Sequence, residues 1–204
     1  MRAALFLVLA ACAASSPRPN TAAAPTASAT PAVAPVQPTP ALAKGMARLS
    51  FMRGVWAGPA TGTTATGEHY SVTQTERMGP MLGGDIVVVE GRGYRDDGTT
   101  GFNAFAVVSW DPRADKYELR SYAMGYSGTF EMKLTDDGYT WEIPAGPGAV
   151  IRYTATIKGD TWREVGAYVA GDQPPRPMFE MNLKRVGDSD WPLGTPIAPS
   201  VAKR

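Results

Sequence analysis

The chain has 204 residues, and its 20 Lys and Arg against 19 Asp and Glu give a formal net charge of +1 at pH 7. No basic run is present, so the electrostatic signature of nucleic-acid binding is missing, and we expect no nucleic-acid partner. A single Cys excludes an intramolecular disulfide and a Cys-based zinc cluster, and a single His leaves little imidazole chemistry. The sequence predicts no metal site.

Residues 1–12 have the layout of a secretory signal, with a charged start and a short apolar run over 3–11. Nine residues are too few to cross a bilayer. The run ends Leu-Ala-Ala-Cys12, which resembles the lipobox of bacterial lipoproteins, where Cys12 would be lipidated. We therefore expect an exported, periplasm-facing protein, anchored by lipid to the outer membrane. The alternative is an A-x-A cleavage site at 11–13, which would remove Cys12 and leave a soluble periplasmic or secreted protein.

The segment 13–43 is rich in Pro and Ala, with few large apolar side chains. Recurrent Pro blocks helix and leaves nothing to bury, so this segment is expected to be a disordered, extended tether. The folded domain is assigned to 44–187, with a short helical lead-in over 41–52. Residues 188–204 are expected to form a flexible tail.

From residue 54 onward the chain is a series of runs rich in Val, Ile, Thr and aromatic residues, separated by Gly, Asp and Pro. Their connections are short and hairpin-like, so neighbouring strands should be antiparallel. About ten such strands would leave unpaired edges unless the sheet closed. We predict an all-β fold: a single antiparallel up-and-down lipocalin-like barrel. The expected strands are 55–62, 69–77, 85–94, 102–110, 117–123, 128–134, 139–143, 150–158, 162–169 and 178–185.

The motifs Gly54-Val55-Trp56, Met81-Leu82-Gly83-Gly84, Trp110-Asp111-Pro112 and Met178-Phe179-Glu180-Met181 occur in this order along the domain. Together they resemble a bacterial domain-of-unknown-function family, numbered fifteen seventy-nine, and the nitrobindin-like branch of calycin barrels. In such barrels the Trp of G-x-W usually plugs the closed end, which implies that role for Trp56. The resemblance covers about residues 49–186.

Nitrobindin-like barrels hold haem through a His late in the chain, whereas the single His here, His69, lies in the second strand run. Met and Tyr can also ligate haem iron, but core packing is the commoner use of Met. The sequence therefore disfavours haem, and no cofactor is expected.

Several charged residues fall within the strand runs, and alternation places most of them on the outer face. Glu164 shares parity with Trp162, which makes it a stronger inward candidate than Glu180, which alternates with Phe179 and Met181. The apolar run 86–89 indicates burial on both faces, with the lead-in helix as a candidate cover. The other charged residues in this group are Glu90, Arg120 and Arg152.

No catalytic motif is present: Gly125-Tyr126-Ser127-Gly128 is no nucleophile elbow, and the Asp pairs at 96–97 and 136–137 fit turns. The first hypothesis is a barrel that binds a small apolar molecule without catalysis. The alternatives are a packed envelope domain with no small ligand and a haem-binding barrel. An enzyme is the last of the hypotheses. The residues expected to contact a ligand are Trp56, Glu164, Tyr168, Met178 and Glu180.

Overall fold

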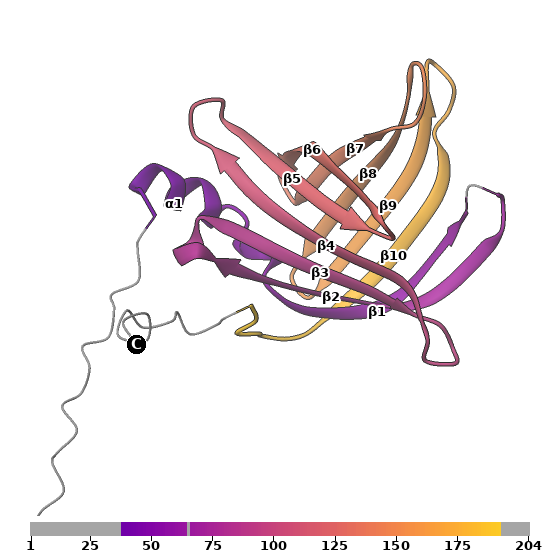
Figure 1. Cartoon of the computed structure of the whole chain (residues 1–204), viewed down its shortest axis with the longest axis horizontal. Helices are drawn as coiled ribbons and strands as arrows, with labels where there is room; N and C mark the ends of the chain where they lie inside the picture. Colours follow the sequence, from indigo (N-terminus) through magenta and orange to yellow (C-terminus); the bar gives the residue numbers. More distant parts are fainter. Residues whose placement is uncertain (1–37, 65, 193–204) are drawn as a thin grey trace, which may run out of the picture. The chain divides into compact units, whose positions relative to one another are not determined.

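The computed structural model describes residues 38–64 and 66–192 (Figure 1). Its ten strands each pair antiparallel with the next, and β1 also pairs with β10, so the sheet closes into a barrel. The predicted fold class is confirmed. The elements are α1 (Pro40–Ala47), η1 (Ser50–Met52), β1 (Gly54–Thr63), β2 (His69–Met81), η2 (Leu82–Gly84), β3 (Ile86–Tyr94), β4 (Thr100–Asp111), β5 (Lys116–Ala123), β6 (Tyr126–Thr135), β7 (Gly138–Pro144), β8 (Ala149–Lys158), β9 (Thr161–Ala170) and β10 (Arg176–Gly187).

The strands form because inward and outward residues alternate between short turns. In β8, Ala155 and Ile157 are buried, whereas Arg152 and Lys158 pair with acidic side chains on the outer face. In the turn between β3 and β4, the carboxylate of Asp97 accepts hydrogen bonds from the amide and hydroxyl of Thr99, at 2.9 and 2.6 Å. Such local bonds fix the tight reversals that antiparallel neighbours require.

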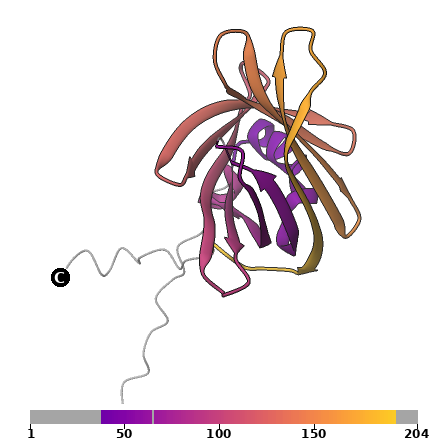
Figure 2. The ribbon, with the colours of Figure 1, turned by 90° about the vertical axis from the view of Figure 1, so that its right-hand side faces the viewer.

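The segment 40–52 closes one end of the barrel. Met46, Leu49 and Met52 are buried in the core, and the hydroxyl of Tyr117 in β5 donates a 2.6 Å hydrogen bond to the carbonyl oxygen of Gly45. Figure 2 looks along the barrel from the opposite end, and α1 lies within the ring of strands. The lead-in helix is thus an end plug.

Trp56 lies in the packed layer at this closed end. Its side chain is 1% exposed, and its indole Nε1 donates to the carbonyl oxygen of Met52 at 3.0 Å. Its ring meets that of Trp162 edge to face, with centroids 5.8 Å apart. This geometry agrees with the plug role that the G-x-W resemblance implies.

The run 86–89 is buried on both faces, as its composition predicts, since Val87 and Val88 are each 1% exposed. The lead-in helix lies against β4, and its Met46 belongs to the same buried core cluster as Val87. Gly79, opposite Val88, has no room for a Cβ because the carbonyl of Trp191 lies on it. The C-terminal segment therefore covers the outer wall here, and the start of the expected tail is packed against the barrel.

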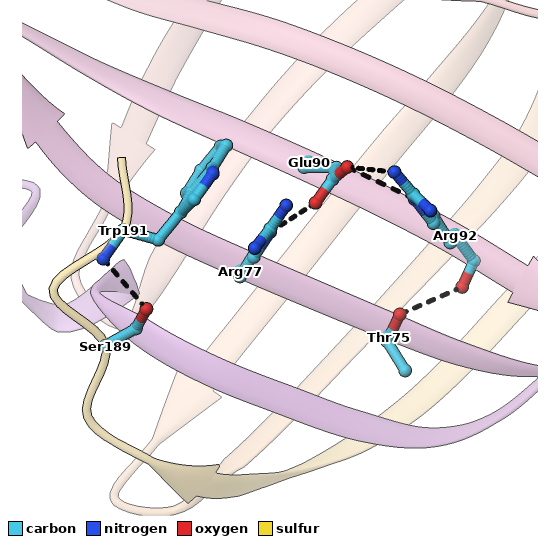
Figure 3. A network of polar contacts seen from close by, with 6 residues as sticks. All are labelled: Thr75, Arg77, Glu90, Arg92, Ser189 and Trp191. Atoms are coloured by element: carbon cyan, nitrogen blue, oxygen red, sulfur yellow. Dashed lines mark hydrogen bonds and ion pairs between the residues drawn. The ribbon is translucent and has the colours of Figure 1, made fainter. Parts of the chain in front are cut away.

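The C-terminal segment packs against a polar network on the outside of β2 and β3 (Figure 3). Arg77 and Arg92 both pair with Glu90, Arg92 at 2.6 Å. The Arg77 guanidinium also lies 4.4 Å from the centroid of the Trp191 ring. Among the described residues, no helix is both long and apolar enough to cross a membrane.

Candidate ligand-binding site

The barrel encloses a cavity of about 440 Å³. Its wall is mainly apolar and runs from Met52 in η1, at the closed end, to Thr63 and Tyr70 near the β1–β2 turn. A volume of this size lies within the usual range of roughly 300–1,000 Å³ for small-molecule sites.

The cavity exists because the strands β3 to β5 present small residues to the interior. Ala104, Ala106, Ser121 and Ala123 point inward where a larger aliphatic side chain would fill the barrel, and Gly91 adds none. The same strand number can enclose either packed side chains or a ligand space, and these small residues decide between the two here.

Two carboxyl groups stand in this otherwise apolar wall. Glu164 of β9 is 6% exposed and accepts two hydrogen bonds: one from the Tyr139 hydroxyl at 2.9 Å and one from the Trp141 indole at 3.3 Å. Both of its oxygens therefore have a donor from β7. This arrangement holds Glu164 in one orientation, as buried polar groups require.

Glu76 of β2 is 8% exposed and is bound differently. The Gln74 amide donates to its Oε1 at 2.7 Å, while its Oε2 accepts no hydrogen bond from the described residues. A Cβ on Gly91, its partner in β3, would lie only 2.5 Å from Oε1, so the glycine makes room for this carboxyl group. The site thus has one fully satisfied carboxyl group and one with a free oxygen.

Burial changes the protonation of both groups. It raises the pKa of Glu76 to about 8; the Gln74 hydrogen bond opposes this rise, and the charges of Glu164 and Glu90 add to it. Burial also raises the pKa of Glu164, against the hydrogen bonds from Tyr139 and Trp141. Because a desolvated carboxylate is costly, burial favours the neutral form of Glu76 near pH 7.

The residues expected to contact a ligand occupy different places. Glu164 and Met178 line the cavity, and Trp56 lies buried at the closed end. Tyr168 does not line the cavity and lies 4.8 Å beneath the guanidinium of Arg176. Glu180 lies on the outer face, paired with Arg163 and Asn182, because its neighbours Phe179 and Met181 take the inward positions. Cys12 lies outside the described residues.

The outward placement of the other charged strand residues agrees with alternation. Glu90 pairs with Arg77 and Arg92, Arg120 pairs with Glu118, and Arg152 pairs with Glu142, all on the outside. The sequence reasoning did not select Gln74 and Glu76. Their parity with Val72 and Met78 in β2 was the signal that could have placed them inside.

This interior offers no imidazole to haem iron in the described part of the chain. His69 does not line the cavity; its Nδ1 lies 3.1 Å from the Thr63 hydroxyl near the barrel mouth. The lining includes no Lys, Arg or His within the described part of the chain, so it offers no cation to haem propionates.

The closed ten-stranded antiparallel barrel with an interior cavity is a lipocalin-like barrel. The crystal structure of Rv2717c from M. tuberculosis is similar to it, with a TM-score of 0.53 and 18% sequence identity. That match covers 72% of this chain and 98% of the other, and at this identity it shows the fold alone. No family model matches the chain, and no curated protein matches it in sequence.

Proposed function

We propose that the barrel binds a small, largely apolar molecule in its interior and does so without catalysis. The observation that carries this proposal is the cavity of about 440 Å³, lined mainly by aliphatic and aromatic side chains. A few polar groups in an apolar wall are typical of ligand pockets, where they fix the orientation of the bound molecule.

The alternative, a packed barrel without a small ligand, would need inward side chains large enough to fill the interior. Ala104, Ala106 and Ser121 do not fill it. The two buried carboxyl groups also favour binding, because polar groups that cost stability are retained most readily where they serve a site. The haem alternative has less support, because neither an imidazole nor a cation lines the interior described above.

The test is to fill the cavity and compare it with a matched change on the outer wall. Ala106→Phe places a ring in the interior, whereas Ala167→Phe places one on the outside of β9. Titration with an environment-sensitive apolar dye should give saturable binding to the wild type and to Ala167→Phe, and little to Ala106→Phe. Equal binding to all three proteins would contradict an interior site.

We also propose that the domain is exported and anchored by lipid at Cys12, and that it belongs to the bacterial domain-of-unknown-function family numbered fifteen seventy-nine, near the nitrobindin-like calycins. The support is the lipobox-like sequence at 9–12 and the ordered motifs that begin with Gly54-Val55-Trp56. An outer-membrane location would place the binding site on the periplasmic side.

A further inference from the structure

Two hydrogen-bond acceptors of the inner wall have no donor among the described residues. The Gln74 amide nitrogen donates to Glu76 Oε1, which leaves the Gln74 carbonyl oxygen and Glu76 Oε2 without a donor from the described residues. Two glycines of β3 lie opposite these side chains of β2. A Cβ at Gly93 would lie 3.0 Å from Gln74 Oε1, and one at Gly91 would lie 2.5 Å from Glu76 Oε1. The two glycines thus make room for both side chains, whose Gln74 Oε1 and Glu76 Oε2 have no donor among the described residues.

The electrostatics of the cavity favour the same kind of partner. Its described lining contains two carboxyl groups and no Lys, Arg or His, although hydroxyl groups such as those of Tyr70 and Ser121 are also present. An anionic ligand such as a fatty acid would meet carboxyl groups where it needs a cation. A cationic group would offset the desolvation of a buried carboxylate.

Resting on the proposed binding of a small molecule inside the barrel, we propose that this molecule carries a protonated primary amine on an apolar body, and that Glu76 and Gln74 receive the amine. The N–H groups would bind Glu76 Oε2 and Gln74 Oε1, and the body would lie along the apolar wall towards the mouth. Charge-assisted bonds of this kind are among the stronger polar contacts in proteins.

Glu76, rather than Glu164, receives the amine because its second oxygen is free. Glu164 already accepts from Tyr139 and Trp141, so a further donor would compete with two bonds in place. Glu164 is a positioning residue in this arrangement, and its charge acts on the same region of the cavity.

The charged and titratable groups around Glu76 are Glu164 on β9, Tyr139 on β7 and, across the sheet, Glu90 on β3 with its partners Arg77 and Arg92. Because the pKa of Glu76 is raised to about 8, binding of a cation below that pH requires loss of its proton. Affinity for an amine should therefore increase about tenfold per pH unit up to about pH 8, whereas affinity for a neutral ligand should stay level.

Three probes with the same alkyl chain test the head group: octylammonium, 1-octanol and octanoate, each used to displace the apolar dye from the protein at pH 8. Octylammonium should bind at least about tenfold more tightly than 1-octanol, and octanoate should bind most weakly. Glu76→Gln should lower the affinity for octylammonium by about ten- to a hundredfold and leave the affinity for 1-octanol unchanged. Glu180→Gln, on the outer face, is the matched control and should change neither.

The outcomes separate this inference from the proposed function. Dye or 1-octanol bound inside the barrel, with octylammonium no tighter or insensitive to Glu76→Gln, would contradict the amine and leave the interior site standing. Failure of the dye to distinguish Ala106→Phe from Ala167→Phe would contradict both. If Glu76→Gln does not fold, the pH series of octylammonium against 1-octanol on the wild type decides: parallel pH profiles would overturn the proposal.

Discussion

Glu76 and Glu164 place two carboxyl groups in a barrel interior where an apolar side chain would cost less. Burial raises the pKa of both groups, so the folded protein binds protons that the unfolded chain releases. Each carboxyl group whose pKa is raised in the folded protein therefore contributes most to stability below its unfolded pKa. That contribution is lost as the pH rises through the folded pKa. For Glu76 that window runs from about 4.5 to about 8.

We predict that Glu76→Gln flattens this pH dependence. The wild type should lose about 3 kcal/mol more unfolding free energy than the variant between pH 5 and pH 7.5, because only the wild type carries the ionising group. Urea denaturation of both proteins at the two pH values measures the difference. Parallel loss of stability would mean that the Glu76 carboxyl group is not desolvated in the folded barrel.

Trp56 is fully buried in the packed layer at the closed end of the barrel. Trp56→Ala removes a fully buried ring that packs on Trp162 and bonds Met52, and it should lower the unfolding free energy by about 3 to 5 kcal/mol. Urea unfolding gives the value, with the slope against denaturant checked for constancy. An unchanged midpoint and slope would show that Trp56 does not plug the barrel.

At the scale of the elements, all ten strands could be predicted from the sequence because each is bounded by turn residues that act locally. The hairpin of Asp97 and Thr99 shows why: side-chain bonds two residues apart need no tertiary partner. The extension of β2 from the expected Arg77 to Met81 could not be predicted, because Gly79 and Pro80 there usually end a strand. That extension pairs with β3 and lies beneath the C-terminal segment.

The candidate site was only partly predictable. Parity with Trp162 correctly placed Glu164 inside, but alternation gives the facing of a residue and not the space in front of it. The cavity depends on the summed size of residues from several strands, such as Ala106 and Ser121, and no single run contains that information. Parity with Val72 and Met78 could have placed Glu76 inside, but its free oxygen becomes evident only when Gln74 lies beside it.

The C-terminal segment is the element whose packing the sequence did not indicate. We predict that Trp191→Ala lowers the unfolding free energy by about 1 kcal/mol, since it removes the ring that lies against the Arg77 guanidinium. Thermal or urea unfolding measures the change, with Tyr126→Ala as the control because Tyr126 is 82% exposed. Equal effects of the two substitutions would contradict a packed C-terminal segment.

For the whole molecule, the N-terminal sequence predicts where in the cell the barrel is located. Metabolic labelling with a fatty acid should mark the wild type and not Cys12→Ser, because only a lipidated Cys would carry the acyl chains. More than one chain is needed for stable anchoring, so the wild type should also stay in the membrane fraction. An unlabelled wild type beginning at Ala14 would support the A-x-A cleavage instead.

The side chains that line the cavity also predict whether the protein binds haem. Hemin titrated into the untagged protein should give no sharp Soret band, because no imidazole lines the cavity in the described part of the chain. Removal of any tag matters because a tag would add histidines. A stoichiometric Soret shift that disappears in His69→Ala would place the protein among haem-binding barrels.

The binding of a ligand inside the barrel is tested most directly by the methyl resonances of its methionines. Exposed Met81 and Met124 do not line the cavity and serve as internal controls. With ¹³C-methyl methionine, titration with 1-octanol should shift the cavity set and leave the two controls in place. Shifts confined to Met81 and Met124, or none at saturating probe, would contradict an interior site. The cavity set is Met52, Met78, Met132, Met178 and Met181.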